Sequence, residues 1–289
     1  MTVQEALSFA VSALAPREIE TPRLDAQIIL SWILKVDRAF LAREPDHVIT
    51  SRQQTIFLKA VELRQLRRPV PYITGESYFF GHRFKINRAV LIPRPETEHL
   101  VDAVRDICAA IERPLIAEVG TGSGCVAISI ALAVPDAMVT SIDISPLALL
   151  IARKNVVIHN VRARVELLEG SLLEPLANGQ KVDIVVSNPP YVTVAQTADL
   201  QPEVRDYEPV LALSGLDGAS GPDGTEVHRT LLKTAHSVLK SNGWVILEVG
   251  MGQAKVVLDY AKHYGYYNLS TITDYSGVER VVVAQAPVA

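Results

Sequence analysis

Two short motifs contain residues whose types and spacing are suited to chemistry. The first is an acidic residue followed by alternating glycines, Glu118-Val119-Gly120-Thr121-Gly122-Ser123-Gly124. Glycines allow a sharp turn and a close approach of the backbone to a ligand, and a helix that starts beside them offers free N–H groups to an anionic end of that ligand. Asp143 follows about 20 residues later, where an acidic side chain can bind both hydroxyls of a ribose. Together they predict a site for an adenosine-containing ligand.

The second motif is Asn188-Pro189-Pro190-Tyr191, directly after an apolar run. Consecutive prolines cannot donate to a strand ladder and stay extended, so they end the strand and fix Asn188 and Tyr191 beyond it. Ligands of open α/β sheets bind at the carboxyl ends of the strands, so we expect this motif at the same sheet edge as the glycines. A strand-ending turn with a capping Asn is the alternative, and the complete string after a glycine motif disfavours it.

The spacing of the glycines separates the candidate ligands. Dinucleotide folds use G-x-G-x-x-G with the third glycine inside the helix, whereas this chain reads G-T-G-S-G. The arrangement resembles the first motif of class I methyltransferases, in which the glycines pass close to the methionine part of S-adenosyl-L-methionine. The alternative is a tight turn that binds no ligand. Asp143, at the distance from the glycines that a ribose contact requires, disfavours this alternative.

Asn-Pro-Pro-Tyr resembles the signature of methyltransferases that act on a planar nitrogen, either an exocyclic amino group of a base or a glutamine amide. Such a nitrogen is a poor nucleophile because its lone pair is delocalised. The Asn188 side-chain oxygen and the Pro189 carbonyl can each accept one N–H and direct the lone pair toward the methyl group, while Tyr191 packs on the flat group. Because a sulfonium is already a strong methyl donor, positioning supplies most of the catalysis and no separate base is required.

Three patterns along the chain predict the elements that position these motifs. Residues 1–72 repeat apolar side chains at helical spacing, residues 73–95 alternate aromatic and β-branched side chains as in a β-hairpin linker, and residues 96–289 alternate strands with helices. Such alternation indicates a mostly parallel sheet covered on both faces, an α/β, Rossmann-like fold. We expect residues 192–224 to lack regular structure. The strands expected around the motifs are Leu115–Val119, Met138–Ile142, Val165–Leu168 and Val182–Val186.

Composition excludes several other classes. The 289 residues carry a formal net charge of −4, which disfavours a protein that grips nucleic acid mainly through its phosphates. Cys108 and Cys125 belong to no CxxC or Cys/His cluster, so we expect neither a disulfide framework nor a metal site. No signal or membrane-spanning run is evident, and we expect a cytoplasmic protein without a membrane partner.

Further segments resemble the peptide chain release factor N5-glutamine methyltransferases (the PrmC/HemK family). The likeness runs through Pro69–Glu76, Val90–Glu98, Tyr207–Leu213, Leu247–Gly250 and Gly277–Val282. In that family the substrate is the glutamine of a Gly-Gly-Gln loop on class-one release factors, methylated at the side-chain nitrogen N5. The resemblance therefore implies a release factor as partner, no stable nucleic acid, and a helical substrate-recognition domain over 1–72, a hairpin linker over 73–95 and a methyltransferase domain over 96–289.

The resemblance also implies residue roles. The expected contacts to S-adenosyl-L-methionine, or to its product S-adenosyl-L-homocysteine, are Glu118, Gly120, Thr121, Gly122, Ser123, Gly124, Asp143, Asn188 and, beside the adenine, Leu172. Asn188, Pro189, Pro190 and Tyr191 would hold the glutamine, with catalysis by Asn188, Pro189 and Tyr191. Many members carry Asp where this chain has Ser171, so the adenine amino group would have to donate its hydrogen bond to Ser171 or to a backbone group instead.

The two motifs leave three alternative functions. An amino-methyltransferase acting on adenine or guanine in nucleic acid would share both motifs, but the chain is acidic and lacks a basic, aromatic-rich RNA-binding module. A nicotinamide-dependent dehydrogenase would need a different glycine spacing. A cofactor-binding regulator would need a degenerate site at Asn188, which is intact. Arg64, Arg67 and Arg68 are expected to form a solvated helix end, with a basic face for an acidic partner as the alternative.

Overall fold

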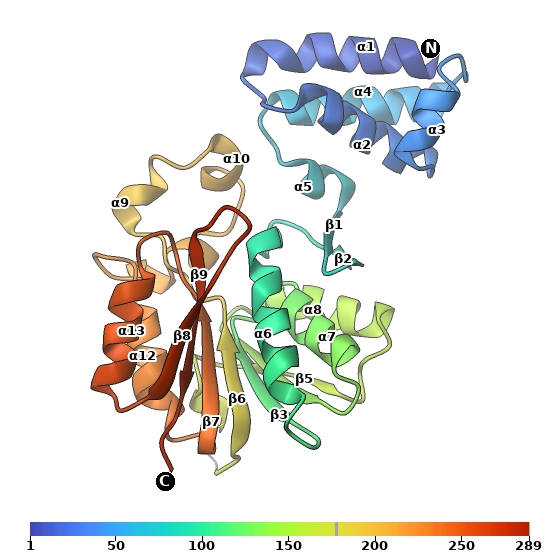
Figure 1. Ribbon diagram of the computed structural model, residues 1–289. Helices are drawn as coiled ribbons and strands as arrows, with labels where there is room; N and C mark the ends of the chain where they lie inside the picture. Colours follow the sequence, from blue (N-terminus) through green and yellow to red (C-terminus); the bar gives the residue numbers. More distant parts are fainter. Residues whose placement is uncertain (177–178, 289) are drawn as a thin grey trace. The chain divides into compact units, whose positions relative to one another are not determined.

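The computed structural model describes residues 1–176 and 179–288 (Figure 1). The chain divides into two compact units. One comprises Met1–Glu76 together with Gln201–Tyr207, and the other comprises Ser77–Leu200 together with the chain from Glu208 onward. A short segment that follows Asn-Pro-Pro-Tyr in sequence therefore belongs to the smaller unit. No helix in the described part of the chain is long and apolar enough to span a membrane.

The smaller unit is helical, as the apolar periodicity predicts. Two of its helices begin with capping boxes, Thr2 with Glu5 and Thr50 with Gln53, in which side chains and backbone satisfy each other's hydrogen bonds. A helix of six residues, Arg38–Arg43, was not predicted because it is too short to show a clear apolar period. The helices are α1 (Val3–Leu14), α2 (Pro22–Leu34), α3 (Arg38–Arg43), α4 (Ser51–Gln65) and α5 (Val70–Thr74), with α10 (Pro202–Arg205) from the second segment.

A buried ion-pair cluster lies inside the smaller unit. Arg64 Nε lies 2.7 Å from Asp25 Oδ2, and Arg64 Nη1 lies 2.8 Å from Glu203 Oε1. Arg67 Nη2 lies 2.7 Å from the other oxygen of Glu203. Arg64 is only 6% exposed, so the prediction of a solvated helix end is wrong for this residue. A buried guanidinium requires carboxylate partners, and these come from residues far away in the sequence.

A sheet of seven strands forms the centre of the larger unit, in the order β5-β4-β3-β6-β7-β9-β8. The first five are parallel, and β9 is antiparallel to both of its neighbours. β3 pairs with β4 on one side and β6 on the other, so the strand order reverses there. The predicted α/β, Rossmann-like fold is confirmed. The strands are β3 (Leu115–Val119), β4 (Met138–Asp143), β5 (Val165–Glu169), β6 (Val182–Ser187), β7 (Leu239–Glu248), β8 (Tyr267–Thr273) and β9 (Glu279–Gln285).

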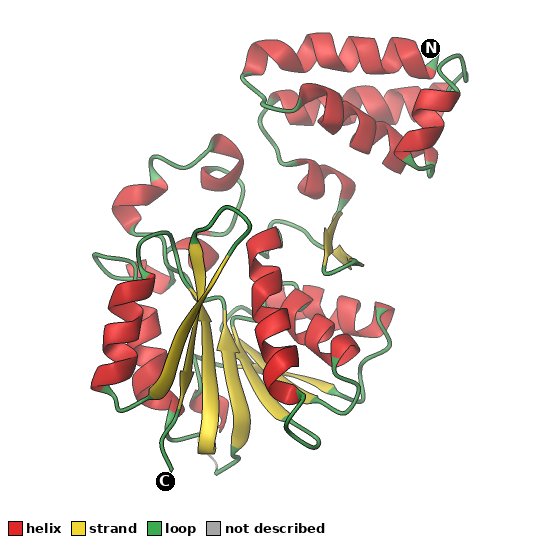
Figure 2. Ribbon diagram, viewed as in Figure 1, coloured by secondary structure: helices red, strands yellow, loops and turns green. Residues whose placement is uncertain are grey.

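Helices cover both faces of this sheet (Figure 2). Consecutive strand residues point to opposite faces. Ile184 of β6 accordingly belongs to the core beneath Leu100 and Ile128, whereas its neighbour Val185 belongs to the core beneath Leu231. Burial on both faces explains why these strands are continuous apolar runs. The covering helices are α6 (Glu98–Cys108), α7 (Cys125–Ala133), α8 (Pro146–Ile158), α12 (Glu226–Ala235) and α13 (Ala254–His263).

The segments between these elements contain more regular structure than the sequence indicated. Strands β1 (Glu76–Phe79) and β2 (His82–Lys85) form a hairpin whose two turn residues both have positive φ. Residues 192–224 were expected to be irregular, and this prediction is wrong. They contain the short helices α9 (Val194–Thr197), α10 and α11 (Val210–Leu213), each four residues long. α9 begins with a capping box, whereas α10 and α11 have no side-chain cap.

Candidate active site

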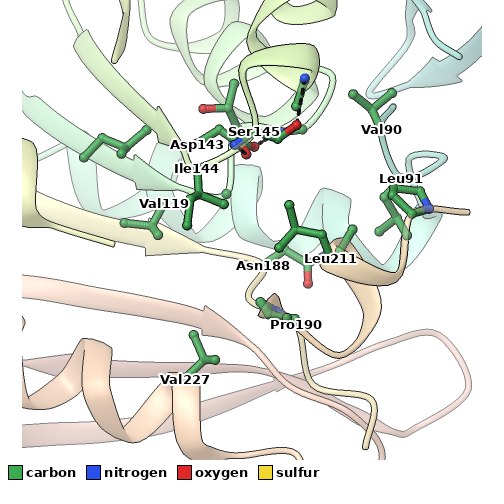
Figure 3. A pocket seen from close by; sticks show the side chains of 18 of the residues that line it. Val90, Leu91, Val119, Asp143, Ile144, Ser145, Asn188, Pro190, Leu211 and Val227 are labelled. Carbon is green, nitrogen blue, oxygen red and sulfur yellow. Dashed lines mark hydrogen bonds between the residues drawn. The ribbon is translucent and has the colours of Figure 1, made fainter. Parts of the chain in front are cut away.

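A cavity of about 630 Å³ opens at the carboxyl ends of β3, β4, β5 and β6, where the strand order reverses (Figure 3). Its volume and mainly apolar walls are typical of a small-molecule site. Figure 3 shows Asp143, the last residue of β4, and Asn188, which follows β6, around the same cavity. The predicted site residues that line it are Glu118, Gly120, Thr121, Gly122, Ser123, Asp143, Leu172, Asn188 and Pro190, and Ser171 lines it too.

The loop after β3 is held against Asp143. The Gly122 N–H donates to Asp143 Oδ2 at 2.8 Å, and the Ser145 N–H donates to Asp143 Oδ1 at 2.8 Å. Burial raises the pKa of Asp143, while these two N–H groups oppose the rise. Gly120 and Gly122 have φ of +84° and +54°, the left-handed region that favours glycine. The glycine loop and Asp143 are thus joined by a hydrogen bond into one unit.

Gly124, the third glycine, has a different function from the other two. It does not line the cavity. A methyl group there would lie 3.1 Å from Ile128 Cδ1 and 3.3 Å from Ala152 Cβ, so this glycine permits close packing of α7 on α8. Its predicted contact with the cofactor stays a prediction.

Glu118 anchors the loop from inside the sheet. Its side chain is 2% exposed and accepts a hydrogen bond from the Ser141 hydroxyl, whose oxygen lies 2.7 Å from Thr121 Oγ1. Burial raises the pKa of Glu118 to about 8, with a further contribution from the charge of Asp143. The carboxyl group is therefore mostly protonated at neutral pH and adds little negative charge to the cavity.

Asn188 stands at the point where β6 leaves the sheet beside β3. The Ser187 hydroxyl donates to the Val119 carbonyl at 2.8 Å, which joins the two strand ends. Asn188 Nδ2 donates to Thr97 Oγ1 at 3.1 Å. With its nitrogen engaged, the carboxamide has its oxygen available as an acceptor. Its backbone carbonyl oxygen would lie 3.5 Å from a side chain at Gly120, so the second motif passes close to the first.

Pro189 and Tyr191 do not line the cavity. The Tyr191 phenol donates to Glu248 Oε1 at 3.3 Å, and the Tyr191 carbonyl accepts from Gln253 Nε2 at 3.1 Å. Burial, together with the Glu248 charge, raises the pKa of Tyr191, so the phenol stays neutral. The predicted contacts of Pro189 and Tyr191 with a substrate stay predictions.

The structure adds site residues that the sequence analysis did not single out. Glu208 Oε1 lies 2.5 Å from Arg94 Nη2, and Glu208 Oε2 accepts from the Ile92 N–H at 3.3 Å. These bonds join two stretches of cavity wall, one around Pro93 and the other around Leu211. Both stretches lie within the segments that resemble the methyltransferase family, and this resemblance was the sequence signal that could have identified them as part of the site. Val227 and Thr230 of α12 also line the cavity, and nothing in their local sequence indicated it.

The cavity wall includes a cysteine thiol, which stays protonated at neutral pH. Cys125 begins α7 beside the glycine loop. Burial raises the pKa of this thiol to about 12, so the reactive thiolate is not populated at neutral pH. The polar groups around the cavity are suited to binding and orienting a ligand rather than to forming a covalent intermediate with it.

The strand order, the cavity at its reversal and the two motifs define a Rossmann-like class I methyltransferase. The family described as methyltransferase small domain matches residues 97–203, and the PrmC N-terminal domain matches residues 5–75. A solved methyltransferase from Pyrococcus furiosus is similar in fold, with a TM-score of 0.53 and 17% identity over 83% of this chain and 100% of that one.

Full-length relatives identify the family. A release factor glutamine methyltransferase from Koribacter versatilis is 36% identical over 287 residues, which cover 99% of each chain. Another, from Moorella thermoacetica, is 39% identical over 285 residues, or 98% of each chain. The chain belongs to the release factor glutamine methyltransferase family, as the resemblance in the linker and loop segments predicted.

Proposed function

We propose that this protein transfers a methyl group from S-adenosyl-L-methionine to N5 of the glutamine in the Gly-Gly-Gln motif of class-one release factors. The main support is the position of Asn188, whose carboxamide lines the same cavity as the glycine loop and Asp143. The near full-length similarity to release factor glutamine methyltransferases supports the choice of substrate. An amino-methyltransferase of nucleic acid is not favoured by these relatives, and we propose no stable nucleic-acid partner.

The residues around the glycine loop fit S-adenosyl-L-methionine. Asp143 carries acceptor lone pairs for ribose hydroxyls beyond the two N–H groups it already binds. The Ser123 hydroxyl is buried at the cavity wall beside the Cys125 thiol, which lets it bond a polar end of a ligand. Leu172 would flank the adenine, with Ser171 or a backbone group at its amino nitrogen. When bound, the cofactor supplies a methyl group on a sulfonium.

On the substrate side, Asn188 and Pro189 would hold the glutamine amide. The Asn188 oxygen and the Pro189 carbonyl would each accept one N–H of the amide, which directs the nitrogen lone pair away from both acceptors. Pro190, in the cavity wall, would limit the space around the amide. Tyr191 would hold the backbone of the Asn-Pro-Pro-Tyr motif in place through its hydrogen bond to Glu248. Precise placement of the nitrogen would provide most of the rate enhancement.

The other parts of the chain would bring the release factor to this site. We assign recognition of the release factor to the helical residues 1–72, a linking role to 73–95, and catalysis to 96–289. The family match to the PrmC N-terminal domain over residues 5–75 supports a dedicated module there. The protein would act in the cytoplasm, where release factors work on the ribosome.

The test is a methyl-transfer assay with radiolabelled S-adenosyl-L-methionine. Purified release factor, its variant with Gln→Ala in the Gly-Gly-Gln loop, bulk RNA and bulk DNA are offered separately. We expect label on the intact release factor only. Label on RNA or DNA instead would assign the protein to the nucleic-acid methyltransferases, and equal label on the Gln→Ala variant would exclude that glutamine as the acceptor.

A further inference from the structure

The orientation of the Asn188 carboxamide decides whether it can bind an amide substrate. Its oxygen accepts hydrogen bonds and its nitrogen only donates, yet the two ends have nearly the same size and shape. If the group were flipped, its N–H groups would face the N–H groups of the glutamine and oppose binding. The active site therefore requires something that fixes this orientation, a requirement that rests on the proposed function.

Thr97 is the direct partner of this carboxamide. Its hydroxyl oxygen lies 3.1 Å from Asn188 Nδ2, and its side chain is 3% exposed, in the turn just before α6. A hydroxyl can both donate and accept, so Thr97 alone would tolerate either orientation of Asn188. The single hydrogen of the hydroxyl must be engaged elsewhere before its oxygen can select the Asn188 nitrogen.

Glu248, the last residue of β7, is the acceptor for the hydrogen of the Thr97 hydroxyl. Its side chain is 2% exposed, and the Thr97 hydroxyl stabilises its carboxylate. An ionised carboxylate only accepts hydrogen bonds, so Thr97 donates to it and presents its own lone pairs to Asn188. Glu248 Oε2 is buried, and no hydrogen bond in the described residues satisfies it. It is therefore the oxygen open to the Thr97 hydroxyl, which lowers the pKa of this carboxylate. The Tyr191 phenol donates to Oε1 of the same carboxylate.

We infer that Thr97 and Glu248 are positioning residues, which fix the Asn188 carboxamide with its oxygen toward the substrate. Glu248 thereby anchors the Asn-Pro-Pro-Tyr motif at both ends, through Thr97 at Asn188 and directly at Tyr191. Neither residue touches the substrate nitrogen in this account. Both act on the reaction through the orientation of Asn188.

The ionisation of Glu248 makes this arrangement sensitive to pH. Burial raises the pKa of Glu248 to about 7, and hydrogen bonds from Thr97 and Tyr191 oppose the rise. The charged groups that face it are Glu96, which raises the pKa further, and Arg280, which lowers it. His228 bonds to the Glu248 backbone carbonyl and stays neutral, because burial lowers its pKa to about 4. A protonated Glu248 can itself donate to Thr97, and the selection of the Asn188 nitrogen is then lost.

The test compares Thr97→Val with Thr97→Ser. Valine keeps the shape of threonine but removes the acceptor, so we expect kcat to fall by about a hundredfold, while the cofactor Kd, measured by calorimetry, and the Tm stay close to wild type. Serine retains the hydroxyl and should restore most of kcat. Wild-type kcat in Thr97→Val would overturn the inference, and so would parallel losses of cofactor binding and Tm, which indicate a purely structural role.

A second variant decides the matter if Thr97→Val does not fold. In wild type, kcat should fall as the pH drops through about 7, whereas Glu248→Gln should show a lower kcat without this acid limb. An unchanged acid limb in Glu248→Gln would overturn the inference. If wild-type protein leaves the release factor unmethylated at every pH, the proposed function itself fails, and the two failures are distinguished.

Discussion

Gly122 and Asp143 are joined by a hydrogen bond of 2.8 Å, from the backbone N–H of the glycine to Asp143 Oδ2. The bond connects the end of β4 to the loop after β3. A loop held by such a bond loses less conformational freedom when a cofactor binds. Asp143 thus has two functions, one toward its own backbone and one toward the ribose in the proposed complex.

Asp143→Asn should weaken cofactor binding without abolishing catalysis. The variant retains one acceptor oxygen in place of two, so one of the two N–H groups loses its partner and the ribose loses a charged acceptor. Loss of a hydrogen bond to a charged group implies a rise in Kd of about ten- to a hundredfold. Calorimetric titration with S-adenosyl-L-homocysteine measures this. Asp136→Asn, at an exposed aspartate before β4, is the matched control and should bind as wild type.

Glu118→Gln should change how stability depends on pH. The pKa of Glu118 is about 8 in the folded protein, above its ordinary value of 4.5. The stability contributed by the protonated group is complete below about pH 4.5 and is lost as the pH rises through about 8. Glutamine does not ionise, so the variant should be more stable than wild type at pH 9, by on the order of a few kcal/mol.

Urea unfolding of both proteins at pH 5 and pH 9 gives the comparison directly. The difference in free energy of unfolding between the two proteins should change with pH in the stated direction. An identical pH dependence in the two proteins would show that Glu118 does not titrate in this range.

Glu203→Gln should destabilise the helical unit. Burial alone would raise the pKa of Glu203, but hydrogen bonds from Arg67 and Arg64 lower it below its ordinary value. Its contribution to stability is thus present at neutral pH and is lost as the pH falls through that lowered pKa. Removing the charge leaves Arg64 buried with Asp25 as its remaining carboxylate partner, and we expect a loss of about 3 kcal/mol in the free energy of unfolding.

An exposed ion pair provides the control for this prediction. Glu226 lies 2.6 Å from Arg229 one turn away on α12, and both side chains are nearly half exposed. Glu226→Gln should change the free energy of unfolding by less than about 1 kcal/mol, because water screens the pair. Equal effects of the two substitutions in urea unfolding would contradict a special contribution from the buried cluster.

Much of the sheet could be predicted from sequence, because strands buried on both faces are distinct apolar runs. β3 has the predicted bounds, and β4 extends only to Asp143, one residue further than expected. The short helices α9, α10 and α11 could not be predicted, because a helix of four residues shows no apolar period.

Site residues could be predicted where they stand in a recognisable local motif. They could not be predicted where the site depends on contacts between residues far apart in the sequence. Gly120 and Asn188 stand in motifs that can be recognised by themselves. Three residues of the site, Thr97, Glu208 and Glu248, form their hydrogen bonds with partners 40 or more residues away, such as Asn188 for Thr97. A local sequence pattern cannot indicate such pairs. Arg64 was misread for the same reason, since both of its carboxylate partners are distant in sequence.

The most direct test of the account is tandem mass spectrometry of the Gly-Gly-Gln peptide from release factor incubated with S-adenosyl-L-methionine and either wild-type protein or Asn188→Ala. We predict a mass gain of one methyl group on the glutamine with wild type and none with Asn188→Ala, while the variant binds S-adenosyl-L-homocysteine with nearly the wild-type Kd. Full methylation of the glutamine by Asn188→Ala, or a methyl group on another residue with wild type, would contradict the central claim that Asn188 holds this glutamine for transfer.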